Sequence, residues 1–209
     1  MKLLTFFISA AMAGAAAAVS AQAIPVEAND LSPTVSKNYP VALSLNYTAM
    51  IGNAPPETCG CFLLNGGSSE ELFHVLRDIA AVGEVSGNRA VQVPQSQQGI
   101  SLITYMGGPR YSVRATRRLT AYGQFLIGGV HGFDTYIPRD DTQPTGAANS
   151  MAYALGGGFE LGLNGWLSFR AIEAQYLITH LPNDINAYQH SVRINSGVVF
   201  RFSASRLRR

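Results

Sequence analysis

A period-two alternation between large apolar residues and small or polar residues constrains this chain more than any other feature of its sequence. Between Met151 and Leu163 the odd positions are apolar or Gly, and the even positions are Ala, Gly or Glu. Val41–Ala49 and Tyr188–Phe202 repeat the alternation with few interruptions. Because successive side chains of a strand point to opposite faces, this pattern predicts long β-strands with one bulky apolar face.

The alternating segments divide into eight expected strands, joined by connections that are long and short in turn. Long connections are expected at 51–68, 89–98 and 133–148, short ones at 77–78, 113–118 and 163–165, and one of intermediate length at 181–186. This regular change of connection length is typical of an antiparallel up-and-down barrel. The expected strands are 40–50, 69–76, 79–88, 99–112, 119–132, 149–162, 166–180 and 187–202.

The first residues have the pattern of a cleavable signal peptide. Lys2 supplies a positive charge, Leu3–Val19 is an almost unbroken apolar run, and Ala21-Gln22-Ala23 matches the small-x-small cleavage pattern. We expect cleavage after Ala23, with cleavage after Ala21 as the alternative. A transmembrane anchor is the other interpretation of the apolar run, whose length nearly reaches the ~20 residues that a membrane helix needs.

This pattern divides the chain into four parts. We expect a signal peptide over 1–23, a periplasmic lead-in over 24–38, an all-β barrel over 39–202 and a basic tail over 203–209. No second long apolar run follows the signal peptide. An exported chain of this kind is either a soluble secreted protein or an outer-membrane barrel.

The polar faces of the expected strands favour a transmembrane barrel over a soluble one. They consist of Gly, Ala and Ser with single Glu and Arg residues, and only 13% of the whole chain is charged. A face in contact with water normally carries more Lys and Asp. In a membrane barrel the bulky residues face lipid, and small or polar residues fill the interior. The alternative is a soluble lipocalin-like barrel, in which Phe159, Phe200 and Phe202 would point inward.

Aromatic residues are frequent near the ends of the expected strands. Aromatic side chains form girdles where a membrane barrel crosses the lipid–water interface. The residues expected at this interface are Tyr47, Tyr111, Trp166, Tyr176, Phe200 and Phe202.

Charged residues of both signs fall on the expected inward faces. An eight-stranded barrel is just wide enough to be filled by its own side chains, and buried charges must be paired. We therefore expect a structural salt-bridge network in the lumen, with a gated pore as the alternative. Arg170 and Glu173 have opposite parity, so both face inward only if a bulge separates them. The expected network consists of Glu84, Glu160, Glu173, Arg110, Arg193 and Arg201.

Cys59 and Cys61 lie in the first long connection of an exported chain, where thiols oxidise. We expect a disulfide between them, although one intervening residue makes such a bridge strained. Metal binding and intermolecular pairing are the alternatives. Two thiolates are an incomplete zinc site, and His74 is the candidate for a further ligand in this region.

Several function classes are disfavoured. The net charge is +2 and the basic residues are scattered, so nothing indicates a nucleic-acid surface. An enzyme would need a His beside a nucleophile and an acid. His131 lies close in sequence to Asp134, and His180 and His190 flank the connection that holds Asp184, but solvated loop residues explain all of these. We expect no catalytic residues, no metal and no cofactor.

Short motifs across roughly residues 39–202 carry a resemblance to a known family. They are Asn53-Ala54-Pro55-Pro56, Cys59-Gly60-Cys61-Phe62, Asn65-Gly66-Gly67, Gly108-Pro109-Arg110-Tyr111, Gly156-Gly157-Gly158, Tyr176-Leu177-Ile178-Thr179 and Val192–Phe202. On these motifs the chain resembles the bacterial eight-stranded outer-membrane β-barrel family related to OmpA and OmpX. Within it, the chain resembles most a subgroup with Cys-Gly-Cys in the first external loop. The resemblance implies a fold and an outer-membrane location, but not one shared activity.

The resemblance also implies that the last strand ends on an aromatic residue that the outer-membrane assembly machinery reads. Phe202 fits that position, and this chain departs from the family pattern by continuing with seven further residues, Ser203–Arg209.

These observations together predict a monomeric outer-membrane barrel with a filled lumen. We expect a structural or surface-interaction role through external loops, chiefly 51–68 and 133–148. The expected partners are outer-membrane lipid, lipopolysaccharide and the assembly machinery. A narrow, porin-like pore for small solutes is the alternative function, followed by a lipid-modifying enzyme.

Overall fold

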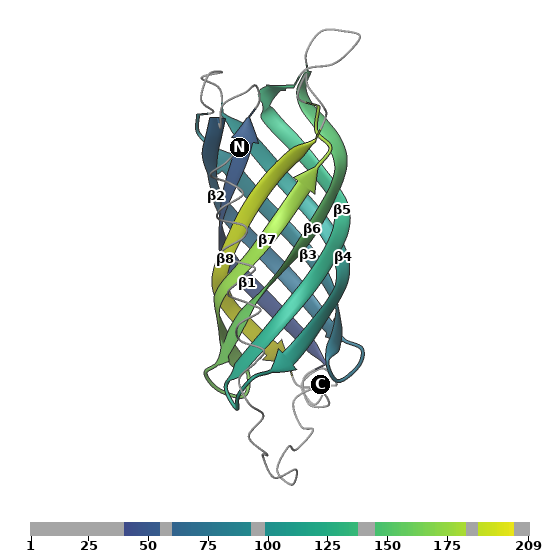
Figure 1. Ribbon diagram of the computed structural model, residues 1–209, viewed down its shortest axis with the longest axis vertical. Helices are drawn as coiled ribbons and strands as arrows, with labels where there is room; N and C mark the ends of the chain where they lie inside the picture. The colour runs from purple at the N-terminus through teal and green to yellow at the C-terminus, as the bar shows by residue number, and fades with distance from the viewer. Residues whose placement is uncertain (1–39, 55–59, 93–98, 138–144, 183–187, 203–209) are drawn as a thin grey trace, which may run out of the picture. The chain divides into compact units, whose positions relative to one another are not determined.

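A computed structural model describes residues 40–54, 60–92, 99–137, 145–182 and 188–202, and these form one closed antiparallel β-barrel (Figure 1). Each strand pairs with its neighbours in the chain, and the first strand pairs with the last. The predicted up-and-down barrel of eight strands is therefore confirmed. The strands are β1 (Val41–Ala54), β2 (Gly60–His74), β3 (Ile79–Ala90), β4 (Ile100–Arg114), β5 (Leu119–Ile137), β6 (Thr145–Gly162), β7 (Leu167–Thr179) and β8 (Gln189–Phe202).

The signal peptide predicted over 1–23, the lead-in over 24–38 and the tail over 203–209 lie outside the described residues. Among the residues that are described, no helix has the length and apolar character needed to cross a membrane.

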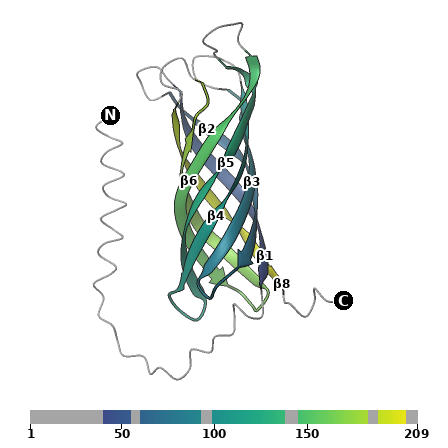
Figure 2. The same ribbon diagram turned by 90° about the vertical axis from the view of Figure 1, so that its right-hand side faces the viewer.

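One end of the barrel, called the turn end below, carries the three short turns 75–78, 115–118 and 163–166. In one of them the Asn164 side chain accepts a hydrogen bond from the Leu167 backbone N–H at 2.8 Å, as turn-forming Asn residues often do. Val41 pairs with Phe202, so β1 begins and β8 ends side by side at the turn end (Figure 2). The opposite end is called the loop end.

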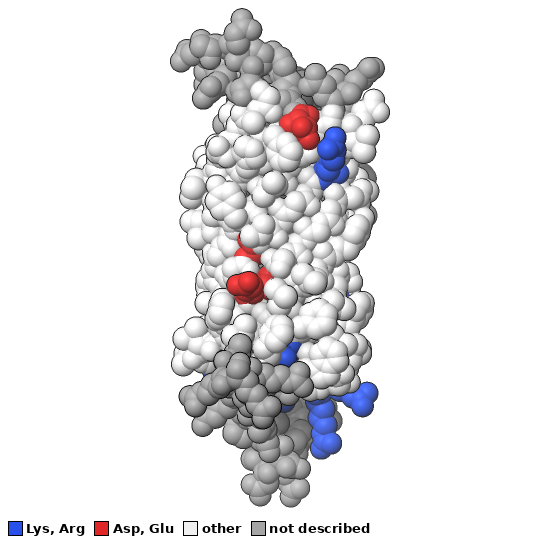
Figure 3. Space-filling model, turned by 180° about the vertical axis from the view of Figure 1, so that it is seen from behind, with Lys and Arg blue, Asp and Glu red and all other residues white. Residues whose placement is uncertain are grey.

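The side chains have the inside-out arrangement that the sequence predicts. Along β6, Leu155 and Phe159 are 64% and 48% exposed on the outer wall, whereas Ala154 and Glu160 are buried inside. Figure 3 shows the outer wall between the two ends as mostly uncharged, with one acidic patch. The exposed Phe159 and Phe202 side chains rule out the soluble lipocalin-like alternative, which needs them inside the barrel.

The expected long connections at 51–68 and 133–148 are wrong. Strand β1 runs on to Ala54 and β2 already begins at Gly60, while β5 and β6 take up most of 133–148. Gly and polar residues normally indicate loops. In a barrel with a polar lumen they are ordinary strand residues, and Gly67 accordingly pairs with Tyr47 on one side and Gly87 on the other. The other expected strands begin or end within a few residues of the observed ones.

Because the apolar side chains of the wall face outward, the loss of stability caused by an introduced charge should depend on its depth in the membrane. Leu155 lies well inside β6, whereas Leu163 lies in a turn at the turn end, and both are exposed. We expect Leu155→Arg to lower the free energy of unfolding from lipid vesicles by about 2–4 kcal/mol and Leu163→Arg by at most about 1 kcal/mol. Denaturant titration of the two variants measures both values. Equal losses would contradict a lipid-facing position for Leu155.

Candidate functional site

The lumen holds four carboxylates and four guanidinium groups, which balance in charge. They come from six of the strands, and all are buried except Arg201, whose side chain is 16% exposed. The members of this lumen network are Glu70, Glu84, Glu160, Glu173, Arg110, Arg170, Arg193 and Arg201.

Glu70 on β2 is shared by two arginines in the part of the network nearer the turn end. Its Oε2 atom lies 2.6 Å from Arg110 Nη2 and 2.8 Å from Arg170 Nη1. The same Arg170 Nη1 lies 2.7 Å from Glu173 Oε2, and Arg170 Nη2 lies 3.1 Å from Glu160 Oε1. Arg170 thus contacts three carboxylates from β2, β6 and β7, a set that compensates for the removal of its charge from water.

A β-bulge places Arg170 and Glu173 on the same side of β7. The register of β7 against β8 shifts between these two residues, and Ala171 and Ile172 are both exposed on the outer wall. An extra residue in one strand reverses the parity of the residues that follow it. The condition set by the sequence for both side chains to face inward is therefore met.

Arg193 on β8 organises the second part of the network. It is ion-paired with Glu84, and its Nε and Nη1 atoms donate to Gln175 Oε1 at 3.0 Å and to Ser86 Oγ at 2.7 Å. Gln175 Nε2 donates to Glu84 Oε2 at 3.2 Å and also to Glu173. The Gln175 amide therefore joins the two parts into one continuous network.

Tyr122 fills the space beside the arginines. The Arg110 guanidinium lies 4.1 Å from the centre of the Tyr122 ring, in cation–π geometry. Gly158 faces Tyr122 across the β5–β6 pair. A Cβ atom at Gly158 would lie 2.4 Å from the Ile172 carbonyl oxygen, so only glycine fits at this point of the wall.

Buried apolar side chains also point into the lumen. Met50, Leu64, Leu126 and Leu177 point inward from β1, β2, β5 and β7, and each is at most 1% exposed. Leu126 and Leu177 both pair with Ala154, and Met50 pairs with Arg193 of the network. Over the described residues, apolar side chains therefore fill the lumen beside the ionic network.

Three carboxylates of the network come close enough to suggest a metal site. Oxygen atoms of Glu70, Glu84 and Glu173 lie within 4.8 Å of one another. Each carboxylate is already ion-paired with an arginine of the network. A divalent cation there would add positive charge to a balanced cluster, so the arrangement is better suited to holding strands together than to binding an ion.

The structure brings all six predicted lumen residues into one network and adds residues that sequence reasoning missed. Glu70 was missed because it falls at the expected start of the strand 69–76, where the adjacent Glu70 and Glu71 indicate a strand that begins later, whereas β2 begins at Gly60. Arg170 was set aside because of its parity, and an inward Arg170 would have required a fourth acid as its partner. The neutral members carried no signal at all; they are Tyr122, Gln124 and Gln175.

Four of the six expected interface aromatics lie at the turn end. Trp166 and Phe200 stack with ring centres 6.2 Å apart. Tyr111 pairs with Ile79 next to a turn, and Phe202 ends β8, both exposed on the outer wall.

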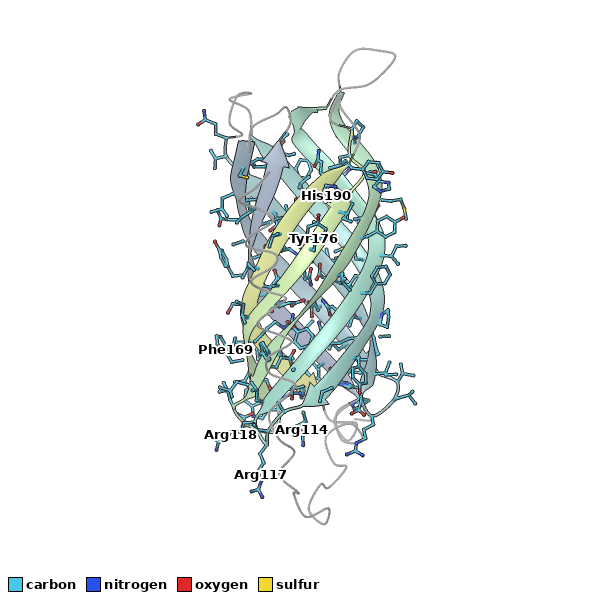
Figure 4. All side chains as sticks on the ribbon, viewed as in Figure 1. Arg114, Arg117, Arg118, Phe169, Tyr176 and His190 are labelled. Atoms are coloured by element: carbon cyan, nitrogen blue, oxygen red, sulfur yellow. The ribbon has the colours of Figure 1, made fainter. Side chains whose placement is uncertain are left out.

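Tyr176 and Tyr47 lie elsewhere on the wall. The Tyr176 hydroxyl is hydrogen-bonded to His190 Nδ1 at 2.9 Å, closer to the loop end (Figure 4). Tyr47 lies midway along β1, so it is at neither end of the barrel.

Cys61 and His74, which were considered as metal ligands, lie far from one another. Cys61 carries no free thiol, and Cys59 lies outside the described residues, so the Cys59–Cys61 disulfide stays a prediction. His74 lies at the opposite end of β2 from Cys61, roughly 40 Å away along an extended strand. That separation excludes His74 as a metal ligand together with Cys61.

The residues weighed for an enzyme have other partners. His131 Nδ1 lies 2.7 Å from Asn149 Oδ1, and Asp134 accepts a hydrogen bond from Ser101 at 3.0 Å and pairs with Arg89 at 3.4 Å. His131 is therefore not oriented by Asp134. Asp184 lies outside the described residues.

Comparison with solved structures identifies the fold. Neisserial surface protein A (NspA) matches with a TM-score of 0.59 at 9% identity, over 78% of this chain and 97% of that one. The attachment invasion locus protein Ail of Yersinia pestis, solved with the heparin analogue sucrose octasulfate, matches with a TM-score of 0.52 at 13% identity, again over 78% and 97%. No family model and no curated protein sequence matches the chain. The chain has the fold of the eight-stranded outer-membrane barrels.

The network predicts that substitutions of two adjacent glutamates differ greatly in their effect on the free energy of unfolding. Glu70 is buried between two arginines, whereas Glu71 is exposed on the outer wall. We expect Glu70→Gln to lower the free energy of unfolding by about 3–5 kcal/mol, because it leaves buried guanidinium charge uncompensated. Glu71→Gln, the matched control, should have little effect. Denaturant titration in lipid vesicles measures both, and similar values for the two variants would contradict the proposed network.

Proposed function

We propose that this protein is an outer-membrane barrel with a permanently filled lumen, whose role is structural or lies in interactions at the loop end. The observation that carries the proposal is the lumen, which the ionic network and buried apolar side chains fill over the described residues. We infer that this filling leaves no continuous path for a solute through the described part of the barrel. Its function is then carried by its outer wall and its two ends.

The outer wall supports insertion in a membrane. Large apolar side chains are exposed on every strand, a surface that water would not tolerate on a monomer. In barrels of this class the short turns face the periplasm and the longer connections face outward. By the same rule, we place the turn end in the periplasm and the loop end outside.

The structure supplies no argument for a pore. Opening the lumen would have to separate Arg170 from its three carboxylates or displace buried apolar side chains such as Leu126 and Leu177. Breaking one buried ion pair costs about 3–5 kcal/mol. The filled state is therefore the favoured one.

The loop end offers a rigid base for an interaction surface. Asp134 holds β3 and β4 to β5 through Arg89 and Ser101. Ail was solved with a sulfated sugar, but a polyanion needs excess positive charge, and the described charged residues here are one arginine and one aspartate in a pair. We therefore propose an uncharged or mixed contact surface, with membrane lipid, lipopolysaccharide and the assembly machinery as the other partners.

A filled lumen predicts the absence of ion conduction. We expect the purified protein in planar bilayers to give no reproducible channels, and Glu160→Ala, which removes a carboxylate shared by Arg170 and Arg201, to give none in its folded form. Single-channel recording tests this. Regular openings in the wild type that Glu160→Ala enlarges or abolishes would favour the pore instead.

Membrane placement is tested separately from the lumen. We expect the protein to sediment with the outer membrane and to migrate faster on a gel before boiling than after it, because an intact barrel resists detergent unfolding. Recovery of the mature protein wholly in the soluble periplasmic fraction would contradict the proposal.

A further inference from the structure

The two ends of the barrel differ in charge. Among the described residues, the loop end carries Arg89 and Asp134, which pair with each other. The turn end carries four exposed arginines and one aspartate. Figure 3 shows blue side chains gathered at this end, and Figure 4 shows three of the arginines pointing away from the barrel. These charged residues of the turn end are Arg77, Arg114, Arg117, Arg118 and Asp78.

The four arginines, called the arginine rim below, come from turn 75–78 (Arg77), the last residue of β4 (Arg114) and turn 115–118 (Arg117 and Arg118). The Ser112 backbone N–H donates to the Asp78 carbonyl oxygen at 2.8 Å, which packs turn 75–78 against the end of β4 that carries Arg114. None of the four makes an ion pair with an acid in the described part of the chain. The rim therefore presents unneutralised positive charge, in contrast to the arginines of the lumen.

Apolar side chains lie beside the arginine rim. Val75 and Leu76 are 67% and 61% exposed in the same turn as Arg77, and Trp166 is 52% exposed in another turn of this end. Aromatic and aliphatic side chains at a barrel end mark the level where lipid tails meet headgroups. The neighbouring guanidinium groups are thus at the height of lipid phosphates.

The residue type also points to phosphate. Lys2 and Lys37 are the only lysines among 15 basic residues, so the positive charge of this end is carried by arginine. A guanidinium group binds phosphate oxygens through two parallel hydrogen bonds, which an ammonium group does not. The chain continues from Phe202, at the same end, into a tail outside the described residues that contains Arg206, Arg208 and Arg209.

We propose that the arginine rim binds the phosphate groups of anionic phospholipids in the leaflet next to the turn end. This inference rests on the membrane insertion proposed above. The ligands of the rim are then lipid phosphates, and their binding fixes the height and orientation of the barrel in the bilayer. The sequence shows this cluster only as scattered basic residues, because pairing of β3 with β4 brings the turn that holds Arg77 beside the end of β4 that holds Arg114.

The test uses the full mature chain folded in phosphatidylcholine vesicles that contain spin-labelled phosphatidylglycerol or spin-labelled phosphatidylcholine. The fraction of immobilised label gives the relative affinity of the barrel for the two lipids. We expect the wild type to prefer phosphatidylglycerol several-fold, and high salt to reduce the preference because it screens exposed charges. The variant R77Q/R114Q/R117Q/R118Q should show no preference, and Arg89→Gln at the loop end, the matched control, should keep it.

The outcomes separate the two proposals. Gel migration before and after boiling reports whether each variant has inserted and folded. A wild-type chain that fails to insert contradicts the membrane proposal. An inserted wild type without preference, or a folded rim variant that keeps it, overturns the phospholipid inference alone. Loss of the preference in Arg89→Gln would equally overturn the assignment to the turn end.

Discussion

The mutual neutralisation of eight charges inside a narrow barrel is the constraint on which the rest of this structure depends. Many of the ion pairs join strands that are not neighbours in the sheet: Glu70 on β2 contacts Arg110 on β4 and Arg170 on β7, and Arg193 on β8 contacts Glu84 on β3. Backbone pairing fixes only adjacent strands. Cross-lumen pairs are satisfied together only when the eight-stranded barrel closes in this register, so the network specifies closure even where its net contribution to stability is small.

Charged and apolar side chains share the lumen for a physical reason. Charged groups in a dry interior need several partners each, and Gln124 and Gln175 add amide donors and acceptors to the network. Met50, Leu64, Leu126 and Leu177 need no hydrogen-bond partners and fill the remaining space by shape alone. Together these side chains fill the lumen of the described barrel, whose outer wall is apolar.

Alternation in the sequence was enough to predict the barrel, its inside-out sense and six members of the lumen network. The missing members show where such reasoning fails. Arg170 was uncertain because one bulge reverses parity along the rest of a strand, and no local residue type marks a bulge there. Glu70 was missed, and loop 51–68 wrongly expected, because Gly66, Gly67 and Ser68 indicate a loop in a soluble protein but are strand residues beside a polar lumen. Charge balance was the usable signal, since an inward Arg170 requires a fourth acid.

The filled lumen also decides where this chain can vary. An inward residue such as Glu70 has partners on several strands, so it cannot change alone, while an outward residue such as Leu155 needs only to remain apolar. Specific contacts with other molecules are then left to the two ends. At the turn end, four arginines have no ion-pair partner among the described residues, whereas every guanidinium group of the lumen network is paired. Arginines are ion-paired in the lumen but not at the described turn end. The positive charge of the arginine rim therefore does not arise from the lumen network.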